Sequence, residues 1–420
     1  MAMRTIRAVM FAFAFGAVPA LAEPLGQFTD HGDIGMPKHP GSATYDAAAG
    51  RYRVTGGGAN MWADHDDFHF VWKKMSGDVS ATTDLVFHSP SPAPGAPGYV
   101  HRKGGIVLRQ DLDPDSVYVD ALRMGNQQLS LQYREVKGGQ THLIWINTPH
   151  QGTVRLEKIG DYAYLSVPGP DGKLHHAGGS FKLKIKGPYY IGLGVCPHDN
   201  NVTETVDFTN VRFAAPTYGG RAAESTLQTM GVDNEWEQTA VVNVEGAIDA
   251  PAWSADGKSF TYGHGGRRYS VPADGMEIAA PVQTGPGAAK TMARNSGVSP
   301  DGQWVYFSAA TDGQRKLWRA HPDGSGRTQV TSGSTRDWEP RVSPDGKWLV
   351  YLAYGASAPV DRMTRSDVEV RLAPITGGTP DESRMRVMAK PFGGPGTLDF
   401  DPWSPDGKNF AFVSARPPGP

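Results

Sequence analysis

Residues 342–347 read Val-Ser-Pro-Asp-Gly-Lys, and near-copies of this stretch recur three more times and decide the fold of half the chain. The four copies centre on Asp256, Asp301, Asp345 and Asp406, and each precedes an apolar run typical of a strand. The steps between these aspartates are 45, 44 and 61 residues. A four-stranded propeller blade repeats every 40–45 residues or so. The repeat therefore predicts a β-propeller with about four blades, with an insertion around residues 355–367 in the third step.

Each copy has the composition of a tight turn. Proline presets φ, aspartate hydrogen-bonds back to the main chain, and glycine takes a positive φ at little cost. The aspartates could instead be metal ligands, but turn chemistry accounts for them fully. We therefore interpret them as structural.

The last copy leaves room for one more strand, residues 409–415. A blade that lacks its outer strands would present an open edge, which promotes association between chains. Residues 225–232 and 237–244 are the natural donors for this edge. We expect them to close the ring with strands from the beginning of the propeller.

The first half, residues 25–213, follows a different pattern, with short alternating runs separated by Gly, Pro, Asp and Asn. About ten strands of this kind favour a two-sheet jelly-roll sandwich, although a closed barrel is also compatible with them. The predicted strands are residues 68–72, 79–85, 105–109, 118–124, 129–134, 142–146, 154–158, 163–167, 189–196 and 205–213. The whole chain is thus predicted to be all-β.

The N-terminus has two arginines, an apolar run over residues 8–18 and a small-residue cleavage site before Glu23. This pattern predicts a signal peptide over residues 1–22 and a periplasmic or secreted protein, with no transmembrane segment after cleavage. The predicted units are the sandwich at 25–215, a spacer with the first closing strand at 216–236, and the propeller at 237–420. Two separately folding pieces are expected.

Charge and cysteine content exclude several classes of protein. With 41 basic and 43 acidic residues, the formal net charge is -2, so nucleic acid is not an expected partner. The one cysteine, Cys196, allows no intramolecular disulfide and no cysteine-based zinc site, and it is expected to be a small buried apolar residue. Asp30, Asp33 and Asp199 carry oxygen ligands suited to a structural calcium ion, without the spacing of an EF-hand.

The repeat resembles the WD-repeat-like blades of the TolB-type propeller family, over residues 237–416. Stretches such as Asp-Trp-Glu-Pro at 337–340 and Phe-Gly-Gly-Pro-Gly-Thr at 392–397 are similar to one exported subgroup of that family. This subgroup usually has six blades, two more than we expect here. The resemblance implies a protein-binding platform in the bacterial envelope. The repeat region has no Gly-x-Ser-x-Gly motif, so a peptidase of the α/β-hydrolase type is not expected.

The first half resembles the concanavalin-like, laminin-G-like sandwiches of exported bacterial proteins. The resemblance rests on residues 56–62 with Phe-His-Phe at 68–70, on 103–109, on 154–156, and on 191–195 with His198. It implies a domain that binds carbohydrate or a partner. Some proteins of this fold are glycosidases, but their Glu-x-Asp-x-x-Glu pattern does not occur here.

Sugar binding requires flat aromatic faces and planar polar groups in a concave site. Successive side chains of a strand point to opposite faces, so Arg109 points away from a core made by Ile106 and Leu108. Tyr118 and Asp120 share one face of their strand by the same rule. On the next strand, one face carries Ser130, Gln132 and Arg134. The same rule places His69 opposite to Phe68 and Phe70. The predicted ligand-binding residues are Trp62, His69, Arg109, Asp120, Trp145 and His198. A structural reading, in which the tryptophans are core or rim residues and Arg109 pairs with Asp120, competes with this one.

The leading hypothesis is an exported, non-catalytic binding protein, whose sandwich engages glycan or envelope polymer and whose propeller engages an envelope protein. No cofactor is expected. The first alternative is a carbohydrate-active enzyme, a hydrolase or lyase, with its acid and base among Asp120, His69 and His198. A pure scaffold in which neither half binds a small ligand is the second alternative.

Overall fold

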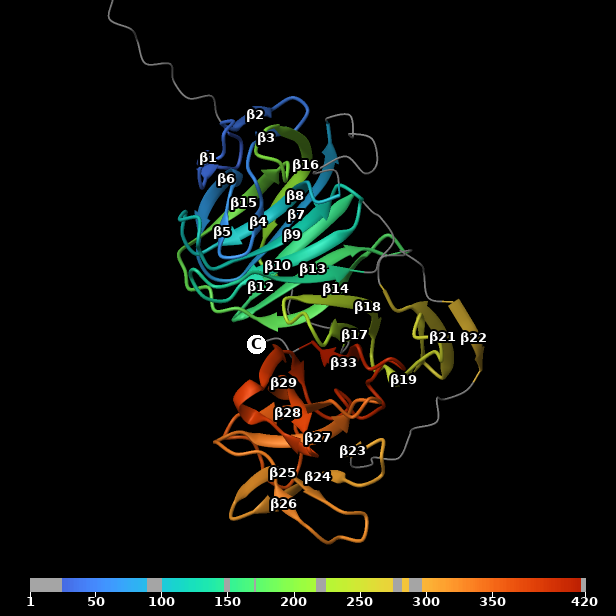
Figure 1. Cartoon of the computed structure of the whole chain (residues 1–420). Helices are drawn as coiled ribbons and strands as arrows, with labels where there is room; N and C mark the ends of the chain where they lie inside the picture. The colour runs from blue at the N-terminus through green and yellow to red at the C-terminus, as the bar shows by residue number, and fades with distance from the viewer. Residues whose placement is uncertain are drawn as a thin grey trace, which may run out of the picture.

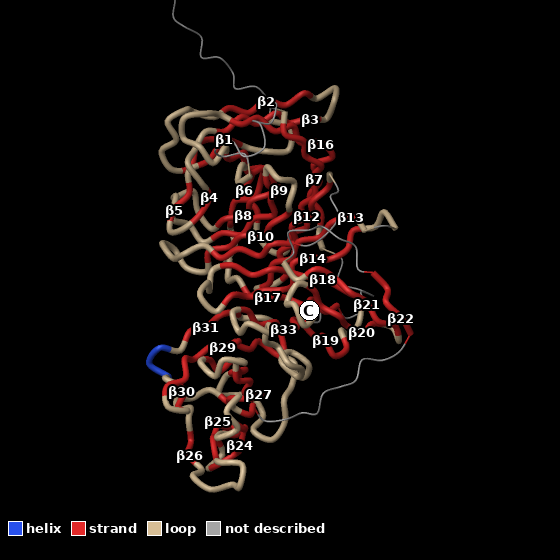
Figure 2. Tube along the Cα trace, turned by 45° about the vertical axis from the view of Figure 1, so that its right-hand side comes forward, coloured by secondary structure: helices blue, strands red, loops and turns tan. Residues whose placement is uncertain are grey.

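The computed structural model describes residues 25–88, 100–146, 152–169, 171–216, 224–274, 282–286 and 297–416. These residues form 33 strands and one short 3-10 helix, Glu382–Arg384, drawn in blue in Figure 2. The prediction of an all-β chain is confirmed. No helix in the described ranges is long and apolar enough to cross a membrane. The predicted signal peptide lies outside the described residues.

Two sheets packed face to face make up the first half, as predicted, and they exclude the closed barrel (Figure 1). The front sheet has the order β1 (Asp30–Ile34), β6 (Phe68–Met75), β15 (Tyr189–Cys196), β8 (Lys103–Arg109), β9 (Tyr118–Met124), β10 (Leu129–Arg134) and β11 (His142–Ile146). The back sheet has the order β14 (Leu174–Lys182), β13 (Tyr162–Pro168), β12 (Thr153–Ile159), β7 (Val79–Phe87), β16 (Glu204–Ala214), β3 (Arg51–Gly56) and β2 (Ser42–Asp46).

The sandwich core lies between these sheets, where alternate residues of each strand meet. Ile106, Leu108 and Leu131 of the front sheet pack with Leu156 and Phe208 of the back sheet, and all five are buried. Burial of this apolar surface is the main favourable term in the stability of the sandwich. The opposite side of the front sheet, which we call the outer face, carries a smaller buried apolar cluster that includes Phe68, Phe70 and Val107.

The second half is built from four-stranded and larger sheets that follow the predicted repeat. One sheet contains β19 (Asp249–Trp253), β20 (Ser259–His264), β21 (Arg267–Pro272) and β22 (Val282–Pro286), and a second contains β23 (Gly297–Val298), β24 (Val305–Thr311), β25 (Gln314–Ala320) and β26 (Thr328–Gln329). A third contains β27 (Arg336–Val342), β28 (Trp348–Tyr354), β29 (Ser366–Thr376), β30 (Thr379–Pro380), β31 (Arg386–Ala389) and β32 (Phe392–Gly393).

The repeated turns have the predicted chemistry. In the copy around Asp345, the Ser343 hydroxyl lies 2.6 Å from Asp345 Oδ1, which also accepts from the Lys347 amide at 3.1 Å. Gly346 has a φ of 73°, and the glycines of the other copies are equally positive. The turns pack on one another, with Gly346 against Pro300 and Gly407 against Asp345. The structural interpretation of these aspartates is confirmed.

The final strand is closed as predicted. β33 (Asn409–Ala415) pairs with β17 (Glu224–Gly231), which pairs in turn with β18 (Glu237–Glu245). The free edge of β18 then pairs in parallel with β11, so one ten-stranded sheet runs from the sandwich into the propeller (Figure 1). No pattern in the sequence predicts this junction. The domain boundary near residue 216 stays a prediction.

Candidate functional site

Cross-strand register defines which side chains share the outer face of the front sheet. Arg109, Tyr118 and Arg134 form one row across β8, β9 and β10. The next row contains Val107, Asp120 and Gln132. A third row contains Gly105, Leu122, Ser130 and Trp145. The parity prediction, which put Arg109 and Asp120 opposite to the Ile106 and Leu108 core, is confirmed.

Three polar residues in these rows form what we call the outer-face cluster: Asp120, Ser130 and Gln132. All three are fully buried. The Gln132 main-chain amide donates to Asp120 Oδ1 at 3.0 Å. Asp120 Oδ2, the Ser130 hydroxyl, and both amide atoms of Gln132 have no hydrogen-bond partner in the structure as described.

Four unpaired polar atoms on neighbouring residues are expensive. A buried donor or acceptor without a partner costs about 1–3 kcal/mol in desolvation. Native structures contain few such groups, and each calls for an explanation such as a water, an ion or a function. These unpaired buried atoms make the outer-face cluster the candidate site on this face of the front sheet.

A segment that we call the strap, residues 60–67, crosses the outer face beside this cluster. It contains β4 (Met61–Trp62) and β5 (His65–Asp66), which pair with each other. Lys103 holds its first end, because its ammonium donates to Asn60 Oδ1 at 2.7 Å and to the Met61 carbonyl at 2.8 Å. The Met61 side chain is buried with Val107 and Leu122.

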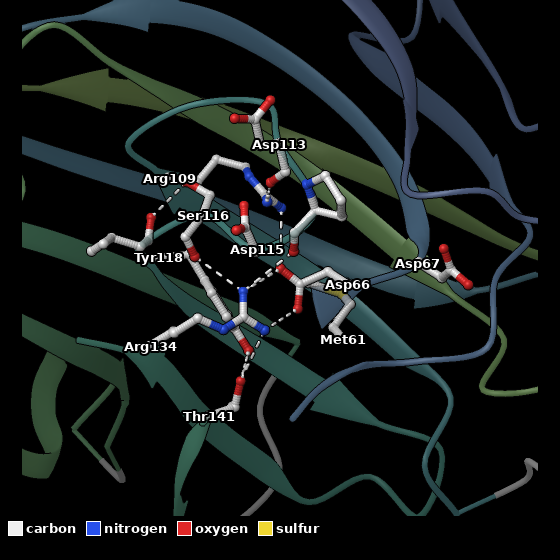
Figure 3. A network of polar contacts seen from close by, with 12 residues as sticks. Met61, Asp66, Asp67, Arg109, Asp113, Asp115, Ser116, Tyr118, Arg134 and Thr141 are labelled. Atoms are coloured by element: carbon white, nitrogen blue, oxygen red, sulfur yellow. Dashed lines mark hydrogen bonds and ion pairs between the residues drawn. The ribbon is translucent and has the colours of Figure 1, made fainter. Parts of the chain in front are cut away.

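Arg134 holds the other end of the strap (Figure 3). Its guanidinium donates to both carboxylate oxygens of Asp66, at 2.9 and 3.1 Å, and also to the Ala63 and Ser116 carbonyls. Arg109 lies on the other side of Asp66, with its Nη1 atom 3.4 Å from Asp66 Oδ2. Both arginines and Asp66 are fully buried, so this network fixes the strap to the sheet.

The structure therefore gives Arg109 a structural partner, although not the expected one. Its guanidinium pairs with Asp66 and donates to the carbonyls of Asp111 and Asp113, at 2.9 and 2.5 Å. The alternative in which Arg109 pairs with Asp120 is wrong, because the strap, whose position the sequence did not predict, inserts Asp66 at this point. A role of Arg109 in ligand binding stays a prediction.

Two predicted tryptophans lie on this side of the front sheet. Trp145 lies directly opposite Ser130 in the β10–β11 pair, and its side chain is half-buried. Trp62 lies on the strap, also half-buried, with the Lys103 ammonium 5.9 Å from the centre of its ring. The predicted combination of aromatic faces and planar polar groups is therefore present on one face.

His69 does not belong to this group, because it projects from the opposite face of the front sheet. Its Nδ1 lies 2.6 Å from Asp33 Oδ1, and its Nε2 lies 2.9 Å from Nδ1 of His31. Both ring nitrogens are therefore occupied, and burial lowers the pKa of this histidine. Sequence reasoning missed the contact because Asp33 and His69 meet only through the β1–β6 register.

His198 lies in the loop after β15, with its ring 5.0 Å from the ring of His101. Burial, reinforced by the Lys103 and His101 charges, lowers its pKa to about 4. Lys103, which hydrogen-bonds to the strap, is thus also a charged residue that acts on His198. Asp120 is not among the groups that shift the pKa of His198. Its φ of 60° is unusual for a residue other than glycine.

Electrostatics couple Lys103 to the cluster. Burial raises the pKa of Asp120 well above its usual value, and the Lys103 charge opposes this rise. Burial likewise lowers the pKa of Lys103, opposed by Cys196 and Asp120. Cys196 is buried on the outer face, as predicted for a small apolar residue.

The calcium prediction finds no site in the structure. Asp33 is engaged by His69 and by the Gly41 amide, and Asp199 Oδ1 accepts from the Asn201 amide at 2.9 Å. Within the described ranges, no group of three or more His, Cys, Asp or Glu side chains could hold a metal ion.

A wide hollow of about 970 Å³ lies elsewhere, between the β17–β18 hairpin and the sheet of β19 to β22. Trp253, Lys258 and Thr239 are among its lining residues. No described side chain that lines it carries a buried polar atom without a partner. Among its described lining residues, the hollow therefore lacks the buried unpaired atoms that mark the outer-face cluster.

Comparison with known proteins gives one clear relative. The chain is 31% identical over 269 residues to the uncharacterized protein Atu1656 of Agrobacterium fabrum, and the match covers 59% of this chain and 83% of the relative. The chain belongs to the Atu1656 family. No family model matches it. The name Atu1656 carries no function, so the site in this family has to be argued from its residues.

Similar solved structures were also found for this Atu1656-family chain. A functionally unknown protein from Saccharomyces cerevisiae is 15% identical, with a TM-score of 0.34, covering 44% of this chain and 97% of the other. TolB from Acinetobacter baumannii is 14% identical, with a TM-score of 0.19, covering 78% and 66%. Scores this low do not define a fold, so the architecture rests on the strand pairing described above.

Sequence reasoning missed Ser130, Gln132 and Lys103 as site residues. The signal for the first two was present, because Ser130, Gln132 and Arg134 alternate with apolar residues along one predicted strand. Such a polar stripe on a central strand needs either solvent or partners. Lys103 and Met61 had no comparable signal, since their roles depend on where the strap crosses the sheet.

Proposed function

We propose that this chain is an exported, non-catalytic binding protein whose sandwich binds carbohydrate at the outer-face cluster. The observation that carries the proposal is the set of four unpaired polar atoms on Asp120, Ser130 and Gln132. Carboxylate, amide and hydroxyl groups are those that recognise the hydroxyls of a sugar ring. Trp145 and Trp62 supply flat aromatic faces on the same side of the sheet.

The complementary chemistry is specific. Gln132 offers one acceptor and a donor group, the Asp120 carboxyl can accept or, when protonated, donate, and the Ser130 hydroxyl can do either. Neighbouring hydroxyls on one ring, each both donor and acceptor, match such a set. A sugar hydroxyl that reached these atoms would give a hydrogen-bond partner to groups that have none in the structure as described, which favours the complex.

The rival function, a glycan hydrolase or lyase, has less support. It needs an acid and a base that reach one reacting bond. Of the three residues suggested for these roles, His69 projects from the opposite face of the sheet from Asp120, with both ring nitrogens hydrogen-bonded. Asp120 remains as a buried carboxyl with a raised pKa but with no facing carboxylate in the cluster.

The propeller is proposed to bind an envelope protein, and the mature chain is proposed to begin at Glu23 in the periplasm or outside the cell. These parts rest on the signal-like N-terminus and on the resemblance to TolB-type propellers. Terminal sequencing of exported protein checks the mature N-terminus: Glu23 is expected, and a retained Met1 would remove the argument for export.

The test of carbohydrate binding uses titration calorimetry on a panel of neutral and uronic-acid glycans, with product analysis on the same samples. Binding without product is expected. Gln132→Ala should weaken it about tenfold or more, because two hydrogen-bonding atoms are lost. Released product from any bound glycan would favour the enzyme instead.

Matched controls come from the exposed β24–β25 turn. Gln314→Ala and Asp312→Asn make the same chemical changes as Gln132→Ala and Asp120→Asn, but on exposed side chains. Both controls should bind like the wild-type protein. Equal losses in the site variants and the controls would overturn the assignment of the site.

A further inference from the structure

Three buried apolar clusters join neighbouring sheets of the second half into one row. Tyr262 of the β19–β22 sheet packs with Val413 of β33. Phe412 of β33 then packs with Leu352 of the β27–β32 sheet. The other face of that sheet packs on the β23–β26 sheet, through Leu317. Within the described ranges, no cluster of this kind joins the β19–β22 sheet to the β23–β26 sheet, so the row is open at both ends (Figure 1).

One end of the row is the free face of the β23–β26 sheet, which we call the aromatic end face. It carries Val298, Val305, Phe307 and Trp318. Val298 lies opposite Val305, and Phe307 lies opposite Trp318, so the register places all four on one side of the sheet. Leu317, the neighbour of Trp318, points the other way, into the packed interface with the β27–β32 sheet.

The aromatic end face keeps large apolar side chains at the surface. Val298 is 53% exposed, and Phe307 and Trp318 are only half-buried. The Arg327 guanidinium lies over both rings, 5.4 Å from the centre of the Phe307 ring and 4.7 Å from that of Trp318. A contiguous apolar patch of this kind is typical of a surface that contacts another protein.

The other end of the row is the free face of the β19–β22 sheet, which we call the hollowed end face. It carries Ala252, Thr261, Ser270 and Val282, which lie opposite one another across the four strands. Val282 is 64% exposed. Arg268 borders these residues and donates to the Thr261 hydroxyl at 3.3 Å. Ser270 and Val282 also line the hollow of about 970 Å³, so this face is recessed.

The two end faces are complementary in shape. Large side chains project from the aromatic end face, whereas the other face is recessed and carries small side chains apart from Val282. The chain uses the same combination internally, where Tyr306 and Leu317 pack with Ala353 and Ala373. Large side chains that interdigitate with small ones give dense packing. Because no described cluster joins the two end faces within one copy, they can meet between copies.

We therefore infer that two copies of this chain associate head to tail, with the aromatic end face of each packed on the hollowed end face of the other. A two-fold axis makes both contacts at once, so neither end of either row stays open. The four sheets of each second half then form one ring of eight, within the range of about four to eight sheets found in propellers. The contact continues the sheet-on-sheet packing already present in the chain and does not depend on carbohydrate binding.

Sedimentation velocity of the intact chain, over about a hundredfold range of concentration, measures this association. A dimer is expected at the high end. Val298→Arg and Val282→Arg each place a charge in the contact from an exposed position, so the fold is kept and the dimer is weakened about a hundredfold or more. Val202→Arg and Val86→Arg make the same change on sandwich valines that are 48% and 66% exposed, and both should dimerise like the wild-type protein.

Mixing the two end-face variants tests the head-to-tail arrangement. In a mixed dimer, Val298→Arg and Val282→Arg share one contact, and the other contact keeps valine on both faces. The mixture should therefore dimerise more strongly than either variant alone. A mixture that associates no better than the single variants would overturn the arrangement.

The wild-type series tests the closed dimer itself. A chain that stays monomeric throughout would overturn the inference, and so would oligomers that lengthen with concentration, because a closed pair has no free end. Equal losses in the end-face variants and in the sandwich controls would also overturn it. Circular dichroism checks that each variant folds, and if one does not, the other and its sandwich control still decide.

Discussion

Trp145 in the sandwich lies directly opposite Thr239 in the first hairpin of the propeller, in a parallel pair of strands. The two halves of the chain therefore share one hydrogen-bonded sheet, and the edge of the sandwich nearest the candidate site is also the seam between the halves. Ala240 of β18 even belongs to the buried core of the sandwich. The site and the propeller are thus held in a fixed relation.

The seam gives a testable consequence for a chain cut between residues 216 and 224. Both pieces are expected to fold, since each has its own buried clusters. The sandwich piece should self-associate through the freed edge of β11, because an unpaired edge strand pairs with other chains. Sedimentation velocity of each piece and of the intact chain measures this. A sandwich piece that does not melt cooperatively would show that the halves are one folding unit.

The unpaired atoms of Gln132 predict a gain in stability when they are removed. Gln132→Met keeps the length of the side chain and abolishes two desolvated polar atoms, so it should raise the free energy of unfolding by about 1 kcal/mol. Glycan binding should be lost in the same variant. Urea titration measures the free energy of unfolding, and calorimetry measures glycan binding. A variant that is destabilised by more than about 1 kcal/mol would mean that Gln132 already has its partners.

Removing the Arg134 side chain, which holds the strap, should cause one of the largest losses of folding stability among single substitutions. Arg134→Ala leaves Asp66 buried without its bidentate partner, and this should cost about 3–5 kcal/mol. Arg267→Ala, at an exposed position in β21, should cost less than about 0.5 kcal/mol. Thermal unfolding of both proteins compares them. Equal melting temperatures would contradict the role of Arg134 as the anchor.

The geometry of the repeated turns predicts that substituting alanine for glycine has different effects on stability at two positions. Gly302 has a φ of 67° and open space around it, so Gly302→Ala should cost about 1–2 kcal/mol from backbone strain alone. Gly355 also has open space but does not have a positive φ, so Gly355→Ala should be neutral or slightly stabilising. Denaturant midpoints measure both. Similar effects of the two changes would count against the assigned turn geometry.

Three histidines predict a loss of stability in acid. Burial lowers the pKa values of His69, His142 and His198 in the folded chain, to about 4 for His198. The unfolded chain binds protons near pH 6.5, where the folded chain does not. Stability from these groups is therefore present above pH 6.5 and is lost as the pH falls toward 4.

Urea midpoints between pH 7.5 and 4.5 check this dependence. His198→Asn should flatten the curve, and asparagine tolerates the φ of 60° at this position. His88→Asn, at an exposed position, should leave the curve unchanged. A wild-type midpoint that stays constant over this range would contradict the buried, neutral state of these rings.

Much of this architecture was predictable because local chemistry determines it. The turns around Asp301, Asp345 and Asp406 require particular residues at fixed positions, and all ten strands predicted in the sandwich are present. Strands β2 and β14 were missed: the first is short and mostly polar, and the second contains Gly178 and Gly179, both at positive φ. Pairing over long distances, such as β11 with β18, leaves no local signal.

The candidate site was predictable only in part, for the same reason. Alternation along a strand correctly placed Asp120 and Arg109 on the outer face, because parity is a local property. Alternation along a strand does not predict that Asp66 pairs with Arg109 in place of Asp120. Nor does it predict that His69 contacts Asp33 on the other face of the sheet. Those contacts depend on loops and on register between strands far apart in sequence.

The central claim is that the outer-face cluster holds a sugar, and a crystal structure of the protein soaked with a glycan that it binds in solution tests it most directly. We expect a sugar residue with hydroxyls within hydrogen-bonding distance of Asp120 Oδ2 and of both amide atoms of Gln132, packed against Trp145. Density for ordered waters alone at Asp120, Ser130 and Gln132, with the glycan bound elsewhere, would contradict it.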